Sequence, residues 1–238
     1  MKAMIFSAGL GTRFKPWTDK HPKALARVNG KPLLQRNIEY LQGFGIRNVI
    51  VNTHHFAEQV TAAIETNQGW GSKVIISDEQ DLLLDTGGGL LKAQPLFTPG
   101  ERFITCNVDI LTNLDIEKLL AFHSSNQALI SFGVTQRQTS RYLLFDDSNR
   151  LCGWRNTKTG EEIIVRGSDV LKQKAYSCVV VFEYAVFDHI ALNGKFSLID
   201  LYLQLAAEHR ILGYDHTGDL WVDVGRPESV RVAEEMFS

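Results

Sequence analysis

The chain has 238 residues, of which 44% are hydrophobic and 22% are charged, as in ordinary globular proteins and unlike disordered or disulfide-rich chains. Its 25 Lys and Arg residues against 27 Asp and Glu residues give a net charge of −2. This excludes binding to nucleic acid or an anionic membrane through overall positive charge. Three widely spaced cysteines without a CxxC pair argue against a zinc site and a disulfide framework. The N-terminal apolar run is too short for a secretory signal, and no segment approaches about 18 apolar residues, so we expect a cytoplasmic protein.

Apolar segments of strand length alternate with segments of helical periodicity through the first half of the chain. The expected strands are Lys2–Ala8, Asn48–His54, Lys73–Glu79, Phe103–Asp109 and Ala128–Gln136. Between them, Lys31–Phe44 and Leu114–Ser124 place apolar residues near one helical face. This alternation predicts an α/β fold with a largely parallel sheet covered by helices.

The pattern changes after residue 136. Arg141–Phe145 and Arg150–Trp154, separated by turn residues, predict a β-hairpin, and the polar segment Arg155–Lys174 predicts a loop or lid. The last expected elements are a strand over Tyr176–Phe182, a helix over Ser197–His209, a strand near Ile211–Tyr214 and a helix over Pro227–Phe237. We expect one domain, residues 1–238, with two unlike halves, 1–136 and 137–238.

A glycine-rich segment follows the first expected strand. Gly9 and Gly11 let backbone N–H groups surround a phosphate without an obstructing Cβ, although a tight strand-to-helix turn explains the same pattern. A dinucleotide fingerprint needs a glycine where Phe14 stands, and a Walker loop needs Gly-Lys-Ser/Thr, so neither applies. Arg13 and Lys23 follow in an irregular, proline-rich loop and suit a triphosphate, with solvated surface charge as the alternative.

Two aspartates stand at the ends of apolar strands. Asp109 follows the strand that begins at Phe103, and Asp223 follows Trp221 and Val222 near the C-terminal end. Ligands collect at strand carboxyl ends in open α/β sheets, and one or two carboxylates with phosphate oxygens commonly hold Mg²⁺. The two aspartates are therefore candidate metal ligands, although an Asp before a glycine turn is common.

Further candidates lie near the same strand ends. Asn107 suits a sugar hydroxyl or a phosphate, or else fixes the turn after its strand. Gly87–Gly89 permits close approach of a flat ligand, or else forms a flexible turn into a helix over Leu90–Ala93. Glu79 stands at the end of the strand before this segment, where it either reaches the same ligand or is a surface acid.

Together these motifs resemble those of the sugar-1-phosphate nucleotidylyltransferase family. The similarity runs in order through Gly9–Thr18, Pro22–Leu25, Asp85–Gly89, Asn107–Asp109 and Trp221–Gly225. The resemblance implies a Rossmann-like, three-layer fold with a mixed, mostly parallel central sheet, in which residues 1–136 form the nucleotide-binding half and residues 137–238 the sugar-phosphate-binding half. It also implies transfer of a nucleotidyl group from an NTP to a sugar 1-phosphate, with release of pyrophosphate and with Mg²⁺ as cofactor. The motifs are closest to those of N-acetylmuramate-1-phosphate uridylyltransferases and mannose-1-phosphate guanylyltransferases.

The resemblance also implies roles for individual positions. The implied catalytic residues are Arg13 and Lys23, and the implied metal ligands are Asp109 and Asp223. The implied nucleotide-binding residues are Ala8, Gly9, Gly11, Thr12, Arg13, Lys23, Gly87 and Gly88. The implied sugar-phosphate-binding residues are Glu79, Asp85, Thr86 and Asn107. Arg155 or Lys158 is a candidate for the cation that relatives direct at the sugar phosphate, with a solvated loop charge as the alternative.

The implied partners are an NTP and a sugar 1-phosphate, without nucleic acid or membrane, and a homodimer is compatible with the sequence. Uridylyl transfer to an N-acetylated hexose 1-phosphate, such as that of N-acetylmuramate, is the first choice because Leu84–Gly89 most resembles that group. The alternatives are guanylyl transfer to mannose or heptose 1-phosphate and cytidylyl transfer to a non-sugar phosphate such as choline phosphate. The intact set of expected catalytic and metal-binding residues disfavours a non-catalytic, nucleotide-sugar-binding regulator.

Overall fold

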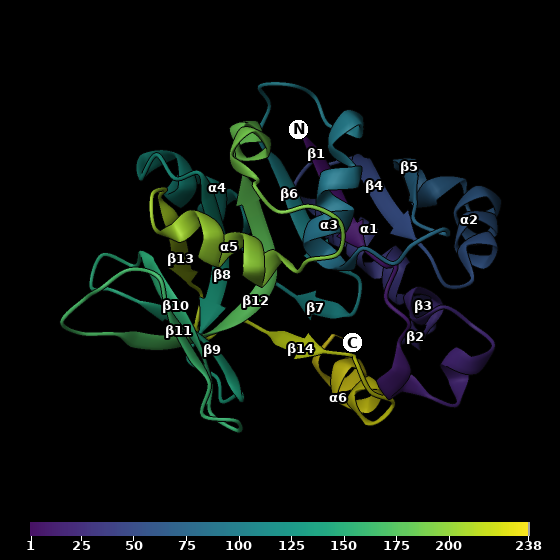
Figure 1. Cartoon of the computed structure of the whole chain (residues 1–238). Helices are drawn as coiled ribbons and strands as arrows, with labels where there is room; N and C mark the ends of the chain where they lie inside the picture. The colour runs from purple at the N-terminus through teal and green to yellow at the C-terminus, as the bar shows by residue number, and fades with distance from the viewer. Residues whose placement is uncertain (238) are drawn as a thin grey trace.

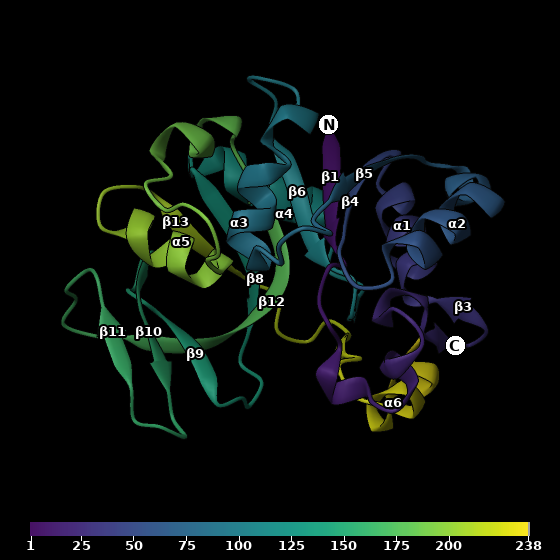
Figure 2. The same ribbon diagram turned by 45° about the vertical axis from the view of Figure 1, so that its right-hand side comes forward.

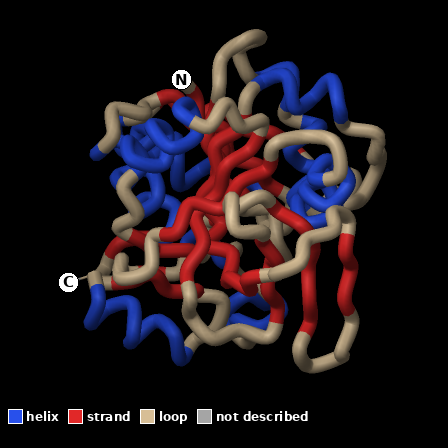
Figure 3. Tube along the Cα trace, turned by 90° about the vertical axis from the view of Figure 1, so that its left-hand side faces the viewer, coloured by secondary structure: helices blue, strands red, loops and turns tan. Residues whose placement is uncertain are grey.

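A computed structural model describes residues 1–237, and Ser238, the last residue of the expected second half, lies outside the described residues. A ten-stranded sheet runs through the middle of the molecule with helices on both sides (Figure 1, Figure 3). The predicted three-layer α/β fold is therefore confirmed. Within residues 1–237, no helix is both long and apolar enough to pass through a bilayer.

The first half of the sheet is parallel. Its strands lie in the order β6 (Phe103–Asn107), β1 (Lys2–Phe6), β4 (Asn48–Thr53) and β5 (Lys73–Asp78). β1, β4 and β6 are almost entirely buried, as expected where helices cover both faces of a parallel sheet. Because neighbouring strands run the same way, their carboxyl ends meet at one edge.

Alternating side chains of β1 divide the core between the two faces of the sheet. Ala3 and Ile5 belong to one buried cluster, and Met4 and Phe6 belong to the other. The first cluster is covered by α1 (Leu33–Gly43), α2 (Ala57–Thr66), α4 (Ile116–Ser125) and α6 (Glu228–Met236). The second is covered by α3 (Asp85–Lys92) and α5 (Leu198–Ala206).

The second half of the sheet is mostly antiparallel. The long β12 (Lys172–Phe182) pairs antiparallel with β6 and with β8 (Ile130–Thr135). The outer strands are β9 (Arg141–Phe145), β10 (Leu151–Asn156), β11 (Glu162–Ile164) and, parallel to β8, β13 (Ile211–Asp215). The register of β12 shifts between Tyr176 and Val180, and Cys178 in this bulge has φ +61°.

The prediction of a loop over Arg155–Lys174 is wrong in part. β10 continues to Asn156, β11 occupies Glu162–Ile164, and β12 begins at Lys172. All three residues of β11 are exposed because this strand lies at the edge of the sheet. An edge strand with no buried face shows no alternation of apolar and polar residues, so its sequence looks like a loop.

Short elements bring the C-terminal segment back to the N-terminal loop. β7 (Ile110–Thr112) pairs antiparallel with β14 (Trp221–Asp223), and β2 (Arg27–Val28) pairs with β3 (Lys31–Pro32). α6 lies beside the β2–β3 hairpin (Figure 2). In the turn of this hairpin, Asn29 Nδ2 donates to Glu234 O (3.0 Å). The 3₁₀ turns are η1 (Thr12–Phe14), η2 (Trp17–Asp19), η3 (Lys23–Leu25), η4 (Gln68–Gly71), η5 (Gln94–Leu96) and η6 (Tyr184–His189).

Candidate active site

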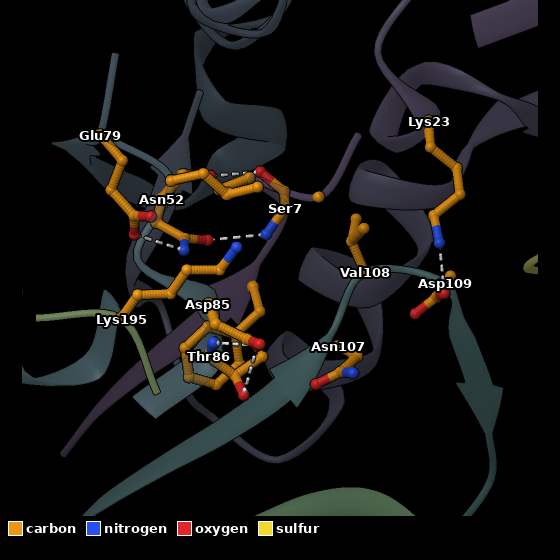
Figure 4. Close-up of a pocket in the computed structure, with 14 residues that line it drawn as sticks. Ser7, Lys23, Asn52, Glu79, Asp85, Thr86, Asn107, Val108, Asp109 and Lys195 are labelled. Carbon is orange, nitrogen blue, oxygen red and sulfur yellow. Dashed lines mark hydrogen bonds and ion pairs between the residues drawn. The ribbon is translucent and has the colours of Figure 1, made fainter. Parts of the chain in front are cut away.

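A pocket of about 320 Å³ opens at the carboxyl ends of the parallel strands, beside the start of α3 (Figure 4). This edge is where ligands bind in open α/β sheets. The pocket is lined by Phe6, Ser7, Ala8, Gly9, Lys23, Asn52, Glu79, Leu83, Asp85, Thr86, Asn107, Val108, Asp109 and Lys195. The pocket brings together eight of the expected site residues: Ala8, Gly9, Lys23, Glu79, Asp85, Thr86, Asn107 and Asp109. Outside the lining lie Gly11, Thr12, Arg13, Gly87, Gly88 and Asp223.

Buried hydrogen bonds fix the floor of the pocket. The Ser7 N–H donates to Asn52 Oδ1 (2.7 Å), and Asn52 Nδ2 donates to Glu79 Oε1 (2.7 Å) (Figure 4). Glu79 Oε2 accepts from the Leu84 N–H (3.3 Å). Glu79 is fully buried, so the alternative of a surface acid is wrong, and burial raises the pKa of its carboxyl. These bonds tie the ends of three strands to the segment before α3.

The glycine-rich loop after β1 leaves backbone N–H groups without partners. No hydrogen bond to another backbone atom of residues 1–237 engages the N–H of Gly9, Leu10 or Gly11. Gly11 has φ +62°, and a Cβ there would lie 2.8 Å from Thr18 Cγ2, so the turn itself requires this glycine. A Cβ on Gly9 would meet nothing within 4 Å. Free N–H groups on an accessible loop are suited to a phosphate.

Two ion pairs connect this basic loop to the two aspartates. Lys23 Nζ pairs with Asp109 Oδ2, and both side chains are largely buried (Figure 4). Arg13 Nη2 lies 3.6 Å from Asp223 Oδ2, in a more exposed pair. Pairing of β7 with β14 places the two aspartates on adjacent segments, where the Val224 N–H donates to Asp109 O (2.8 Å).

The two carboxylates provide oxygen ligands for a divalent cation. Asp223 Oδ1 is buried and has no hydrogen-bond partner among residues 1–237. A Cβ on Gly225 would lie 2.5 Å from this oxygen, so the glycine keeps space beside it. The described part of the chain holds no cluster of three His, Cys, Asp or Glu side chains arranged for a metal. A cation here would rely on two carboxylates and on ligand phosphate oxygens, a donor set that fits Mg²⁺.

The three consecutive glycines lie inside α3 and not in a flexible turn. The expected helix over Leu90–Ala93 is therefore corrected, since α3 already begins at Asp85. The N–H groups of Gly87 and Gly88 both donate to Phe196 O (2.9 and 3.1 Å), and a Cβ on Gly87 would collide with the Phe196 ring. These glycines let α3 pack closely against the loop before α5. Their contact with a nucleotide stays a prediction, and their N–H groups already have a partner within the chain.

Asp85 and Thr86 connect α3 to the second half of the molecule. Asp85 has φ +61°, and its Oδ1 accepts from the Thr86 N–H (2.6 Å). Thr86 Oγ1 in turn accepts from the N–H of Leu198, the first residue of α5 (2.9 Å). Asn107 ends β6 beside the same pocket, which leaves its amide facing the space a ligand would fill.

Three polar residues of the pocket fall outside the predicted site: Ser7, Asn52 and Lys195. Ser7 and Asn52 end buried apolar strands, and this position in the sequence was the signal for them. Lys195 belongs to the exposed loop before α5, and its side chain extends into the pocket (Figure 4). No local pattern marks Lys195, because only the packing of its loop on α3 brings it there.

Comparison with known proteins agrees with this arrangement. Residues 2–143 match the family model described as Nucleotidyl transferase. The chain belongs to the nucleotidyl transferase family. It is therefore an enzyme, and the family resemblance predicted from the motifs is confirmed.

Relatives of this nucleotidyl transferase match it over nearly its whole length. It is 29% identical to the N-acetylmuramate alpha-1-phosphate uridylyltransferase of Caulobacter vibrioides, over 98% of this chain and 95% of that protein. It is 30% identical to the protein of the same name from Neisseria meningitidis, over 94% and 93%. It is 25% identical to the mannose-1-phosphate guanylyltransferase catalytic subunit beta of Drosophila melanogaster, over 95% of this chain and 60% of that one. The fold matches that of HddC from Yersinia pseudotuberculosis with a TM-score of 0.79 and 22% identity, over 100% and 99% of the two chains.

Proposed function

We propose that this nucleotidyl transferase transfers a uridylyl group from UTP to an N-acetylated hexose 1-phosphate, with N-acetylmuramate 1-phosphate as the first choice. The observation that carries the proposal is that two ion pairs, Lys23–Asp109 and Arg13–Asp223, join an open glycine loop to two aspartates on adjacent segments. The first pair lines the pocket and the second lies outside its lining. Positive and negative groups placed together in this way suit a triphosphate and a cation. Similarity to two N-acetylmuramate 1-phosphate uridylyltransferases over at least 94% of the chain supports the choice of substrate.

Residues of the chain support this reaction by positioning and charge. The N–H groups that begin at Gly9 and the Arg13 guanidinium hold the leaving pyrophosphate, and Lys23 lies near the α-phosphate or the sugar phosphate. An oxygen of the sugar 1-phosphate attacks the α-phosphorus in line. The bond from that phosphorus to the pyrophosphate oxygen breaks, and its electron pair leaves with pyrophosphate. No covalent intermediate or protein base is needed, because a phosphate monoester is already an anion.

The cofactor we propose is Mg²⁺, with Asp109 and Asp223 as its protein ligands. When bound, it supplies positive charge that neutralises the reacting phosphates. The buried, unpartnered Asp223 Oδ1 supports this role. Lys23 and Arg13 face the same two carboxylates and supply further positive charge at this end of the site.

A second candidate is guanylyl transfer to mannose 1-phosphate. It is favoured by the 25% identity to a mannose-1-phosphate guanylyltransferase subunit over 95% of this chain. Glu79 at the pocket floor does not distinguish a uracil from a guanine base. Both of its carboxylate oxygens already accept hydrogen bonds within the chain, from Asn52 and from the Leu84 N–H.

The proposal is tested by measuring pyrophosphate release with UTP, GTP, CTP, ATP and dTTP. Each is combined with N-acetylmuramate, N-acetylglucosamine, glucose, mannose and heptose 1-phosphates and with choline phosphate. We expect the highest kcat/KM with UTP and N-acetylmuramate 1-phosphate, and a Lys23→Ala variant purified in the same way controls for contaminating enzymes. A clear preference for GTP would overturn uridylyl transfer, and no release above that control with any pair would overturn the proposal.

A further inference from the structure

Two lysines line the pocket, one from each half of the chain. Lys23 comes from the loop after β1, and its Nζ pairs with Asp109. Lys195 comes from the loop before α5 and lines the same pocket. Within residues 1–237, no carboxylate lies within the 4.0 Å of an ion pair with Lys195 Nζ, and no hydrogen bond engages this atom. The positive charge of Lys195 is therefore available to a ligand.

The backbone next to Lys195 is fixed against α3. The Phe196 N–H donates to Leu84 O (3.2 Å), and the Phe196 side chain is buried. Phe196 O accepts from the N–H groups of Gly87 and Gly88 (2.9 and 3.1 Å). Because three backbone hydrogen bonds hold the neighbouring residue, Lys195 has a fixed place at the pocket wall, and only its side chain is free to meet a ligand.

Lys195 lies across the pocket from the proposed phosphate site. In Figure 4 its side chain enters from the side of Asp85 and Glu79, whereas Lys23 and Asp109 lie on the other side. Lys195 is thus separated from the residues that we assign to the phosphates. A cation on this side of the pocket suits an anionic group of the substrate other than its phosphates.

The other charged side chains on this side of the pocket are carboxylates. The two oxygens of Glu79 accept hydrogen bonds from Asn52 and Leu84. Asp85 Oδ1 accepts from the Thr86 N–H (2.6 Å). A carboxylate that a ligand brings to this side meets like charge, so its binding requires a cation, and Lys195 supplies one.

Two other basic side chains of the second half are placed elsewhere. Arg155, a candidate from the sequence, pairs with Glu162 on the outer strands, and Lys158 is exposed in the turn between β10 and β11. Neither of these candidates lines the pocket. Lys195 is the basic residue that the second half contributes to this lining.

The acceptor sugars of the two candidate functions differ in charge. N-acetylmuramate 1-phosphate carries a lactyl ether with a carboxylate, whereas N-acetylglucosamine 1-phosphate is the same sugar with a hydroxyl in its place. Mannose 1-phosphate has no carboxylate either. An ammonium is a compact point charge, and its hydrogen bond to a carboxylate is stronger than one to an uncharged hydroxyl. Lys195 is therefore suited to the acidic sugar.

We propose that Lys195 binds the lactyl carboxylate of the acceptor and so selects N-acetylmuramate 1-phosphate over N-acetylglucosamine 1-phosphate. This inference rests on the proposed transfer to an N-acetylated hexose 1-phosphate. It adds a residue that determines the choice of sugar. Lys195 takes no part in the transfer of the nucleotidyl group, because it lies away from Lys23 and Asp109.

The test measures kcat and KM for N-acetylmuramate 1-phosphate and N-acetylglucosamine 1-phosphate, each with UTP, in wild type, Lys195→Met and Lys195→Arg. Met keeps an unbranched side chain without the charge, and Arg keeps the charge. Lys73→Met is the matched control, because Lys73 is exposed at the amino end of β5, whereas the pocket lies at the carboxyl ends. The readout is the ratio of kcat/KM between the two sugars, because damage to the fold or to nucleotide binding lowers both values together.

We expect Lys195→Met to lower kcat/KM for N-acetylmuramate 1-phosphate by about 10- to 100-fold, mainly through KM, with little change for N-acetylglucosamine 1-phosphate. Lys195→Arg should retain most of the wild-type preference, and Lys73→Met should behave like wild type. An equal loss with both sugars, or an unchanged ratio in Lys195→Met, would contradict the role of Lys195. The proposed function would still stand in that case, provided that wild type prefers N-acetylmuramate 1-phosphate.

The wild-type protein separates the remaining outcomes. Equal use of the two sugars by wild type would show that Lys195 selects neither, and the inference would be wrong. If wild type prefers GTP with mannose 1-phosphate, or releases no pyrophosphate with any pair, the proposed function itself fails, and the role of Lys195 fails with it.

Discussion

The two halves of the sheet build their parts of the site in different ways. In the parallel half, the ends of β1, β4, β5 and β6 converge, so residues that follow these strands in sequence meet in the pocket. In the mostly antiparallel half, Lys195 of the pocket comes from the loop before α5, and Asp223 comes from β14, which pairs with β7. The parallel half thus carries its chemistry in compact motifs, whereas the other half depends on tertiary packing.

Removing the metal or either aspartate should have the largest effect, because the segments that carry Asp109 and Asp223 pair across the boundary between the halves. EDTA should abolish turnover, and excess Mg²⁺ should restore it. Asp109→Asn and Asp223→Asn should each lower kcat by about 10³-fold or more, and the double variant should be little worse than the more damaged single variant, since residues that act as a unit are not additive. Steady-state pyrophosphate release measures this. Full activity in EDTA, or multiplicative effects of the two substitutions, would show that they do not share one cation.

Loss of the loop cations, which the parallel half supplies, should be the next largest effect. Lys23→Ala and Arg13→Ala should each reduce turnover by about 10²–10³-fold, because each removes a preorganised charge at the phosphates. The exposed Lys20→Ala is the matched control and should retain activity. Circular dichroism should show the fold intact in all three variants. Turnover near that of wild type for both Lys23→Ala and Arg13→Ala would rule out the proposed phosphate site.

The contact between the halves is tested by two helical glycines. A Cβ on Gly88 would collide with Gly194 O and approach Leu84 Cβ to 3.0 Å, whereas a Cβ on Gly43, at the end of α1, meets nothing within 4 Å. Gly88→Ala should lower the free energy of unfolding by about 1–3 kcal/mol and reduce activity by moving α3. Gly43→Ala should be neutral or stabilising, by up to about 1 kcal/mol. Urea denaturation of both variants measures the difference, and equal stabilities would show that the close packing of α3 is unimportant.

The sequence predicts the parallel half well because local patterns and tertiary position coincide there. Strand ends mark Asp109 and Asn107, and the loop after the glycines marks Lys23, and all three residues line the pocket. Prediction fails where the environment is set by distant segments. The glycines of α3 look like a flexible turn until Phe196 is packed against them, and β11 looks like a loop because no face of it is buried. Lys195 has no motif, since only the packing of its loop on α3 brings its side chain to the pocket.

The smallest effect concerns an ion pair that supports the antiparallel half. Burial raises the pKa of the Asp215 carboxyl, but hydrogen bonds from Thr217 and Lys174 outweigh this and lower it from 3.8 to about 2. The folded pKa lies below the unfolded one, so the stabilisation is complete above about pH 4 and is lost as the pH falls toward 2. Asp215→Asn should cost about 1–2 kcal/mol at pH 7, and its difference from wild type should shrink below pH 4 and disappear as the pH falls through about 2. Urea unfolding as a function of pH measures this, with Asp147→Asn, the exposed partner of Lys172, as a neutral control. A difference that does not change with pH would contradict the pKa shift.

The most direct test of transfer by this site is ³¹P NMR of wild-type protein with Mg²⁺, UTP and N-acetylmuramate 1-phosphate. We expect the signals of UTP and the sugar phosphate to fall together, while the signals of pyrophosphate and of the diphosphate of a UDP-sugar appear in equal amounts. These changes should be absent with Lys23→Ala. Formation of UMP with pyrophosphate, or an unchanged spectrum with every NTP and sugar phosphate, would contradict nucleotidyl transfer to a sugar phosphate at this site.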